Sequence, residues 1–218
     1  MRKAFDKQRK AALKDLVKKA AGNKPKLDAA ALQKLLEKQA KDGANEALNQ
    51  VSEYIIEGDI SIMLGQANEK AVAWASDHAA ELVTQIDGTT RDGLAALVAK
   101  AEEEGWTNDQ LSEAIGEFSG FDDARCDLIA TTETAFADVA GNLAGWQESG
   151  VVEGKKWLLA QDEFCDDCAE MDGKSVGLDE TFDFDGEEID GPPGHPRCRC
   201  DLLPEVMSQE DIDAATEE

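Results

Sequence analysis

Four of the five cysteines and one of the two histidines of this 218-residue chain fall within one short stretch. The stretch begins with C-D-D-C at Cys165 and Cys168, and it ends with H-P-R-C-R-C at His195, Cys198 and Cys200. Two thiolates spaced C-x-x-C on a tight turn can bind one metal ion, and a second turn carrying His and Cys can complete its tetrahedral coordination. This spacing predicts a structural Zn²⁺ site.

The five candidate ligands exceed by one the four that a tetrahedral ion needs. His195-x-x-Cys198 repeats the spacing of Cys165-x-x-Cys168, whereas Cys198 and Cys200 would share a face of an extended chain. The expected set is therefore Cys165 and Cys168 with two of the other three residues. The sequence does not decide which two.

Two other chemistries fit the same residues less well. A pair of disulfides would suit a secreted protein, but no signal peptide precedes the chain and Cys126 would lack a partner. A catalytic Cys–His pair would need an exposed cysteine that the metal knuckle leaves unused. The sequence shows no nucleotide-binding glycine loop and no Ser-His-Asp set, so we expect a structural protein and not an enzyme.

The cysteine stretch also carries a resemblance to a known family. The residues concerned are Trp157, Asp162, Cys165, Cys168, Asp172-Gly173, Pro192-Pro193 and His195-Pro196-x-Cys198-Arg199-Cys200. Together they resemble the C-terminal signature of the Mu F-like phage head-morphogenesis family, the minor head proteins of tailed viruses. Upstream, the segment from Ile129 to Thr134 resembles the family's I-A-R-T-E segment, with Thr131 where Arg is usual. The resemblance covers roughly residues 90–203.

The resemblance implies a minor head (capsid) protein with a structural role in head morphogenesis. It implies several copies inside the head or at the portal vertex, portal or major capsid proteins as partners, and the host cytoplasm during assembly. The alternatives are a zinc-containing nucleic-acid-processing or nuclease module and a phage-encoded adaptor protein. A nuclease needs basic surface near its site, whereas residues 151–218 hold 5 Lys/Arg and 21 Asp/Glu.

Charge is distributed unevenly along the chain. The 22 Lys/Arg and 47 Asp/Glu give a net charge of −25, which opposes nucleic-acid binding by most of the surface. Residues 1–50 nevertheless hold 13 Lys/Arg and 6 Asp/Glu, a net +7, which leaves −32 for residues 51–218. Such acidity also suits solvation in high salt, as in a halophilic or marine source. No apolar run approaches the ~20 residues that span a membrane.

Residues 2–21 have the pattern of a basic amphipathic helix. Phe5, Leu13, Leu16 and Val17 recur at helical spacing among lysines, and Gly22-Asn23 should end the helix. We expect an arm whose charge attracts packaged DNA, an acidic partner protein or the acidic remainder of its own chain.

Helical patterns also cover most of the chain up to residue 150. Their expected bounds are 28–57, 58–87, 91–105, 107–120 and 122–148. The last helix is the best defined, because six residues line one stripe that needs a packing partner: Ile129, Thr132, Phe136, Val139, Leu143 and Trp146. Core packing within the protomer and a seam between subunits are both compatible with this stripe.

After Gly150 the pattern changes to that of strands. Residues 156–160 are an expected strand that leads into the first cysteine pair, and residues 198–203 are a second that Pro204 should end. The acidic loop around Asp183-x-Asp185-Gly186 lacks the ligand spacing of a calcium loop, so we expect it to be solvated. Ser208 should cap a last helix over 209–216.

These patterns predict an α+β, mainly α, fold: a multi-helix body followed by a small β-containing C-terminal region clipped by the Cys/His site. The expected parts are a basic N-terminal helical arm (1–58), a helical body (59–150), a Cys/His zinc-binding β region (151–204) and an acidic tail (205–218).

Overall fold

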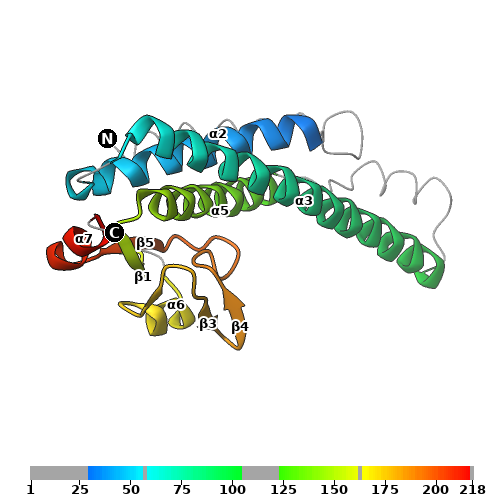
Figure 1. Cartoon of the computed structure of the whole chain (residues 1–218). Helices are drawn as coiled ribbons and strands as arrows, with labels where there is room; N and C mark the ends of the chain where they lie inside the picture. Colours follow the sequence, from blue (N-terminus) through cyan, green and yellow to red (C-terminus); the bar gives the residue numbers. More distant parts are fainter. Residues whose placement is uncertain (1–28, 56–57, 105–122, 162–163, 217–218) are drawn as a thin grey trace. The chain divides into compact units, whose positions relative to one another are not determined.

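The computed structural model describes residues 29–55, 58–104, 123–161 and 164–216 (Figure 1). The basic arm predicted at 2–21, the helix predicted at 107–120 and Asp162 lie outside the described residues. The described part is mainly helical with a small β region near the C-terminus, which confirms the fold class expected from the sequence. None of its helices is both long enough and apolar enough to cross a membrane.

Three long helices precede the β region in the described residues: α2 (Ala29–Val51), α3 (Ile60–Glu104) and α5 (Asp123–Ser149), with a 3₁₀ turn, η1, at Ser52–Tyr54. The β region then contains β1 (Val152–Leu158), α6 (Asp166–Met171), β2 (Ser175–Gly177), β3 (Phe182–Phe184), β4 (Glu187–Ile189) and β5 (Asp201–Val206), followed by α7 (Gln209–Thr216).

The chain divides into two units, each made of separated segments. One unit combines Met1–Gln33 with Asp77–Ala130, and the other combines Lys34–Ser76 with Thr131–Glu218. All five candidate ligands fall in the second unit, which therefore contains the site. In the first unit, Ala79 and Leu82 are the buried apolar side chains of α3 among its described residues. The four-part division expected from the sequence stays a prediction.

The helix α3 continues through the position at which the sequence predicted a break. Gly88-Thr89-Thr90 lies within the helix, so the prediction of two separate helices at 58–87 and 91–105 was wrong. An isolated glycine in a helical pattern costs only about 1 kcal/mol relative to Ala. The helical pattern on both sides of Gly88 outweighs that cost.

In the second unit, α5 packs against α2 through small residues. A Cβ on Gly141 would collide with the carbonyl oxygen of Ala40, and a Cβ on Gly145 would lie 2.6 Å from that of Ala44. Such close backbone approach requires glycine. Gln39, which is 1% exposed, donates from Nε2 to Thr134 Oγ1 at 3.5 Å across the same interface.

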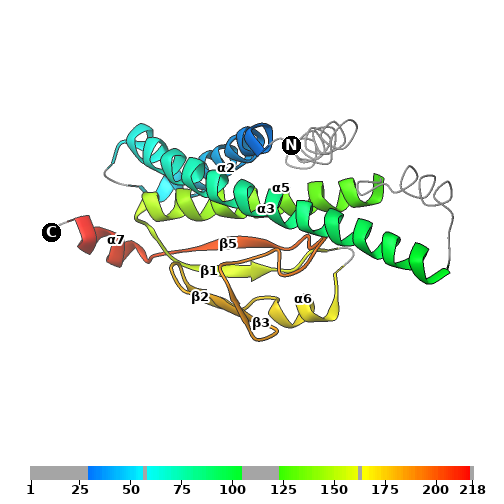
Figure 2. The same cartoon turned by 90° about the vertical axis from the view of Figure 1, so that its right-hand side faces the viewer.

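The apolar stripe predicted on α5 faces the other way, toward the β region. Val139 and Trp146 belong to the core cluster that also contains Trp157 of β1 and Leu202 of β5. Figure 2 shows α5 between α2 and the two strands β1 and β5. Trp146 is fully buried, whereas Phe136 is only half-buried, so Trp146 is the main anchor of the stripe.

The strand β1 is the centre of a three-stranded antiparallel sheet with the order β2-β1-β5. Trp157 pairs with Leu202, and Lys155 pairs with Pro204. The expectation that Pro204 ends the second strand was wrong, because β5 continues to Val206. A strand at the edge of a sheet pairs on one side only and can therefore accommodate a residue without an N–H. The strands β3 and β4 form a separate hairpin.

Aromatic rings join the hairpin to the sheet. The Trp157 ring lies 5.5 Å from the Phe182 ring, edge to face, and 5.8 Å from the Phe184 ring, nearly parallel to it. All three side chains are buried. At the end of the chain, Ser208 Oγ accepts from the backbone N–H of Asp211, so the predicted cap of the last helix is confirmed.

Candidate metal centre

The first cysteine pair stands at the start of α6. Cys165 is the N-cap residue, and its Sγ accepts a hydrogen bond from the backbone N–H of Cys168 at 3.3 Å. One turn of helix therefore places both sulfurs on the same side of the backbone. Cys168 is 1% exposed, and Cys165 is half-buried.

The second group of ligands comes from the turn before β5. The backbone N–H of Cys198 donates to the carbonyl of His195 at 3.1 Å, which closes the turn. Arg197 has a φ of +65°, in the left-handed region that non-glycine residues rarely adopt. Cys200 immediately precedes β5, and both Cys198 and Cys200 are buried.

The structure brings the two groups together. His195 Nε2 lies 3.2 Å from Cys165 Sγ and 3.1 Å from Cys168 Sγ. Cys168 Sγ lies 3.7 Å from Cys198 Sγ. Zinc–sulfur bonds of about 2.3 Å give a tetrahedron whose sulfur–sulfur edges are about 3.8 Å. The Cys168–Cys198 distance therefore suits two ligands of one ion.

Cys168 belongs to both halves of the cluster. The ligand atoms of Cys165, Cys168 and His195 lie within 4.8 Å of one another, and so do those of Cys168, Cys198 and Cys200. Cys165, Cys168, Cys198 and Cys200 are free thiols in the structure and do not form the two disulfides considered above. A cluster with this donor set could hold a metal ion.

The His195 ring is oriented for metal binding by its own backbone. Its Nδ1 lies 2.9 Å from the carbonyl oxygen of Pro196. A carbonyl can only accept, so this contact places the proton on Nδ1 and leaves the lone pair of Nε2 directed at the cysteines. Such an outer hydrogen bond is typical of histidines that bind metals.

Burial and mutual hydrogen bonding shift the pKa values of the thiols. Burial, together with the Cys165 hydrogen bond, raises the pKa of Cys168 to about 12. The hydrogen bond between Cys198 and Cys200 raises the pKa of Cys198 and lowers that of Cys200 to about 5. The raised pKa values of Cys168 and Cys198 favour their protonated forms, and a divalent cation would displace these protons because it compensates the charge of buried thiolates.

Apolar side chains enclose the cluster on the side of the hairpin. The Phe184 ring lies 6.4 Å from the His195 ring, centroid to centroid. A Cβ on Gly194 would lie 2.7 Å from Phe184, so this position needs glycine for the loop to pass the ring. Cys198 and Cys200 are buried, whereas Cys165 and His195 are half-buried.

The geometry also explains other residues of the resemblance. Asp172 Oδ1 accepts from the backbone N–H of Leu159 at 3.1 Å, and Gly173 N–H donates to Trp157 O at 3.0 Å. The Asp172-Gly173 turn therefore returns the chain from α6 to β1. Gly173 has a φ of +75°, which favours glycine.

A model of the family described as Phage Mu protein F like protein matches residues 92–203. The chain belongs to this family. The match covers just over half of the chain and includes all five candidate ligands, which confirms the resemblance found in the sequence. Neither the curated proteins nor the solved structures yielded a match. Family membership indicates a phage head-morphogenesis protein, with a location in the virion or at its assembly.

One functional contact of this Mu F-like protein was not expected from the sequence. The backbone N–H of Arg197, within the His195–Cys198 turn, donates to Thr132 Oγ1 of α5 at 3.1 Å. The sequence placed Thr132 on the apolar stripe of that helix and within the segment similar to I-A-R-T-E, without a role in the metal site. A hydroxyl on such a stripe was one available signal, since a half-buried polar side chain needs a hydrogen-bond partner.

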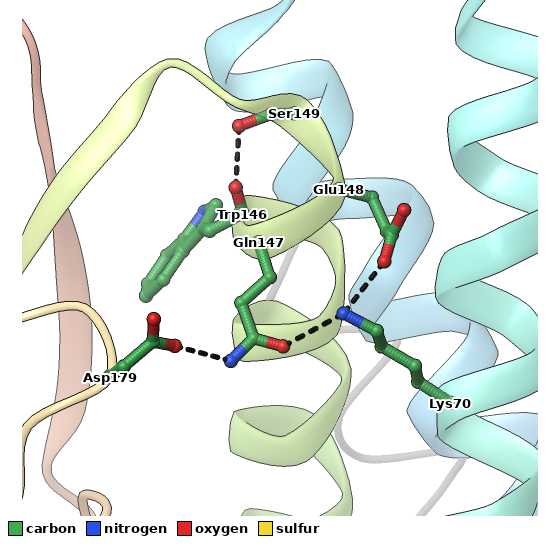
Figure 3. Close-up of polar contacts among 6 residues, drawn as sticks. All are labelled: Lys70, Trp146, Gln147, Glu148, Ser149 and Asp179. Atoms are coloured by element: carbon green, nitrogen blue, oxygen red, sulfur yellow. Dashed lines mark hydrogen bonds and ion pairs between the residues drawn. The ribbon is translucent and has the colours of Figure 1, made fainter.

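A second polar cluster joins three elements away from the cysteines (Figure 3). Lys70 of α3 donates to Gln147 Oε1 at 3.2 Å, and Gln147 Nε2 donates to Asp179 Oδ1, beyond β2, at 2.9 Å. Lys70 also pairs with Glu148 at 2.7 Å. Lys70, Gln147 and Asp179 line an open cleft of about 460 Å³. These side chains form hydrogen bonds and an ion pair with one another, so the cluster connects α3, α5 and the loop after β2.

Proposed function

We propose that this Mu F-like protein is a minor head protein whose β region is held together by one structural zinc ion. The observation that carries this proposal is the convergence of His195 Nε2 and the sulfurs of Cys165, Cys168 and Cys198 at distances of 3.1–3.7 Å. Cysteine and histidine are the donors of structural zinc sites.

The favoured ligands are Cys165, Cys168, His195 and Cys198. These four are connected by contacts of 3.2, 3.1 and 3.7 Å, and His195 groups with Cys165 and Cys168, whereas Cys200 groups with Cys168 and Cys198. Zinc would supply folding free energy to this region and would join the turn before β5 to the start of α6. A set in which Cys200 replaces His195 or Cys198 is the alternative.

Metal analysis tests the site directly. Protein purified under reducing conditions should contain one zinc per chain, and Cys168→Ser should remove it. The Cys200→Ser variant should still bind zinc, whereas the Cys198→Ser variant should not. The reverse result would make Cys200, and not Cys198, the fourth zinc ligand. Two disulfides and no metal, found by mass spectrometry, would contradict the proposal.

The role of the protein in the virion is proposed from family membership and charge. We place several copies inside the head or at the portal vertex, in contact with portal or major capsid protein, with a structural and not an enzymatic role. The donor set of four cysteines and one histidine supports this, because such side chains can fill all four positions of a structural zinc ion, whereas a catalytic zinc keeps one position for water or substrate. The acidic composition of residues 151–218 argues against a nuclease module.

Purified virions provide the test of this placement. The protein should be present at a fixed copy number, and cross-linking should join it to portal or capsid protein. Its absence from virions would contradict the proposal and would favour the assembly-adaptor alternative.

The basic N-terminal residues are proposed to bind packaged DNA or an acidic partner surface. Residues 1–21 hold 8 Lys/Arg and 2 Asp/Glu. Deletion of residues 1–21 should leave the melting temperature unchanged and weaken association, with affinity falling steeply as salt rises. Lower stability with unchanged association would show instead that the segment docks on its own protein.

A further inference from the structure

The turn that carries His195 and Cys198 has an unusual backbone. Arg197 lies between these two residues with a φ of +65°. The turn's internal hydrogen bond, from Cys198 N–H to His195 O, leaves the Arg197 N–H directed away from it. A non-glycine residue in this region persists only where surrounding contacts hold it there.

The contact that holds the Arg197 backbone comes from 65 residues earlier in the chain. Thr132 Oγ1 accepts the Arg197 N–H at 3.1 Å. Thr132 belongs to α5, a helix that packs further along against α2 at Gly141 and Gly145, and into the core cluster at Val139 and Trp146. A side chain on such a rigid element can fix a turn more accurately than a side chain on a loop.

We infer that Thr132 is a positioning residue of the metal centre. Its hydroxyl holds Arg197 in the left-handed conformation, and this conformation directs His195 Nε2 and Cys198 Sγ toward the Cys165–Cys168 pair. The inference rests on the proposed zinc site. It also gives a physical reason why the two separate segments of the family resemblance, around Thr132 and around His195, occur together.

Zinc affinity of matched variants tests the inference. Thr132→Val keeps the shape of the side chain but removes the acceptor, and we expect zinc affinity to fall by about 10-fold or more, as measured by competition with a chromophoric chelator. Thr132→Ser keeps a hydroxyl and should bind within about 2-fold of the unaltered protein. Thr131→Val is the control, because in the described part of the chain the neighbouring Thr131 hydroxyl makes no hydrogen bond to this turn.

The possible outcomes separate this inference from the function it rests on. An unaltered protein that binds no zinc would overturn both. Zinc binding by Thr132→Val within 2-fold of the unaltered protein would overturn the positioning role alone. An equal loss in Thr131→Val and Thr132→Val would also overturn it, because a general loss of helix stability would then explain the result.

A glycine at position 197 tests the backbone mechanism. Glycine adopts positive φ without a steric penalty, so it has less need of an external contact. Thr132→Val should therefore weaken zinc binding less in an Arg197→Gly background than in the unaltered protein. A loss of the same size in both backgrounds would show that Thr132 does not act through the Arg197 conformation.

Discussion

The α2–α5 helix pair and the β region of the same unit are stabilised in different ways. The helix pair satisfies its backbone hydrogen bonds internally and packs through glycine and alanine, with Gly141 against Ala40 and Gly145 against Ala44. In the β region, β2, β3 and β4 are only three residues long. Such short strands form few hydrogen bonds and bury little apolar surface.

This difference explains why the cysteines occur where they do. The aromatic cluster of Trp157, Phe182 and Phe184 gives the β region a core, but acidic residues crowd its surface, including Asp183 and Glu187. The proposed zinc ion would add folding free energy that these short elements do not supply. The helix pair has no such requirement, since its close packing extends over several turns.

Removal of the proposed zinc ion is expected to have the largest effect, and an effect on only one of the two regions. Chelation, or Cys168→Ser, should unfold the β region while α2 and α5 keep their helicity. The loss should be of the order of 10 kcal/mol for the zinc-dependent part, by analogy with small zinc-folded domains. Hydrogen exchange would show which residues unfold, and we expect the backbone amides of β1 and β5 to lose their protection.

Cys126→Ser is the matched control for that experiment, because Cys126 lies outside the cysteine cluster in the sequence. It should leave protection in β1 and β5 unchanged. Simultaneous unfolding of both regions in Cys168→Ser would contradict the comparison, because it would make the helix pair dependent on the metal.

The converse experiment disturbs the helix pair. Gly141→Ala places a methyl group against the Ala40 carbonyl and should lower the free energy of unfolding by about 1–3 kcal/mol, measured by urea denaturation. Zinc content should not change. Gly65→Ala in α3 is the control: apart from its chain neighbours and the nearby backbone of its own helix, no atom lies within 4 Å of its Cβ position, so it should be neutral or stabilising. Equal effects at the two glycines would contradict close packing.

Lys155 tests the electrostatics of the β region. It is 1% exposed, and its Nζ lies 5.9 Å from the centroid of the Phe182 ring. Burial lowers its pKa below 10.5, although Asp190, Asp179 and Glu180 oppose the shift. The cost of its buried charge is fully present below the folded pKa and disappears as pH rises toward the unfolded pKa.

Lys155→Met should therefore raise the free energy of unfolding at pH 7 by on the order of 1 kcal/mol. The gain should shrink as pH approaches 10.5, the ordinary value for lysine. Urea denaturation at several pH values would measure this difference in the free energy of unfolding between the variant and the unaltered protein. A gain that grows with pH would show that the three carboxylates outweigh burial. Lys156→Met is the control, since Lys156 is partly exposed and paired with Glu205.

The smallest expected effect concerns the polar link between α3, α5 and the loop after β2. Gln147→Ala removes its hydrogen bonds to Lys70 and Asp179 and should cost about 0.5–1 kcal/mol, because both lie at the surface. Gln209→Ala, which removes one hydrogen bond within α7, should cost less. A larger loss at Gln147, read from urea denaturation, would indicate that this link couples the two regions.

The sequence predicted the features whose causes are local. The α5 helix at 122–148 follows from apolar residues at helical spacing, and the structure has it at Asp123–Ser149. Ser208 was recognised as a cap because capping depends on a residue and the three that follow it. The cysteine and histidine cluster was evident because ligand spacing within a turn is set by local geometry.

Features that depend on distant partners were decided by the tertiary structure. Gly141 and Gly145 have no local reason to be glycine, and their role appears only when α2, about 100 residues earlier, packs against them. Whether Pro204 could lie within a strand depended on β5 being at the edge of the sheet. Thr132 contacts the turn of the candidate metal centre because α5 passes Arg197. Residue types and short spacings specify ligands and helices, but only the packing of separated segments determines which backbone groups meet.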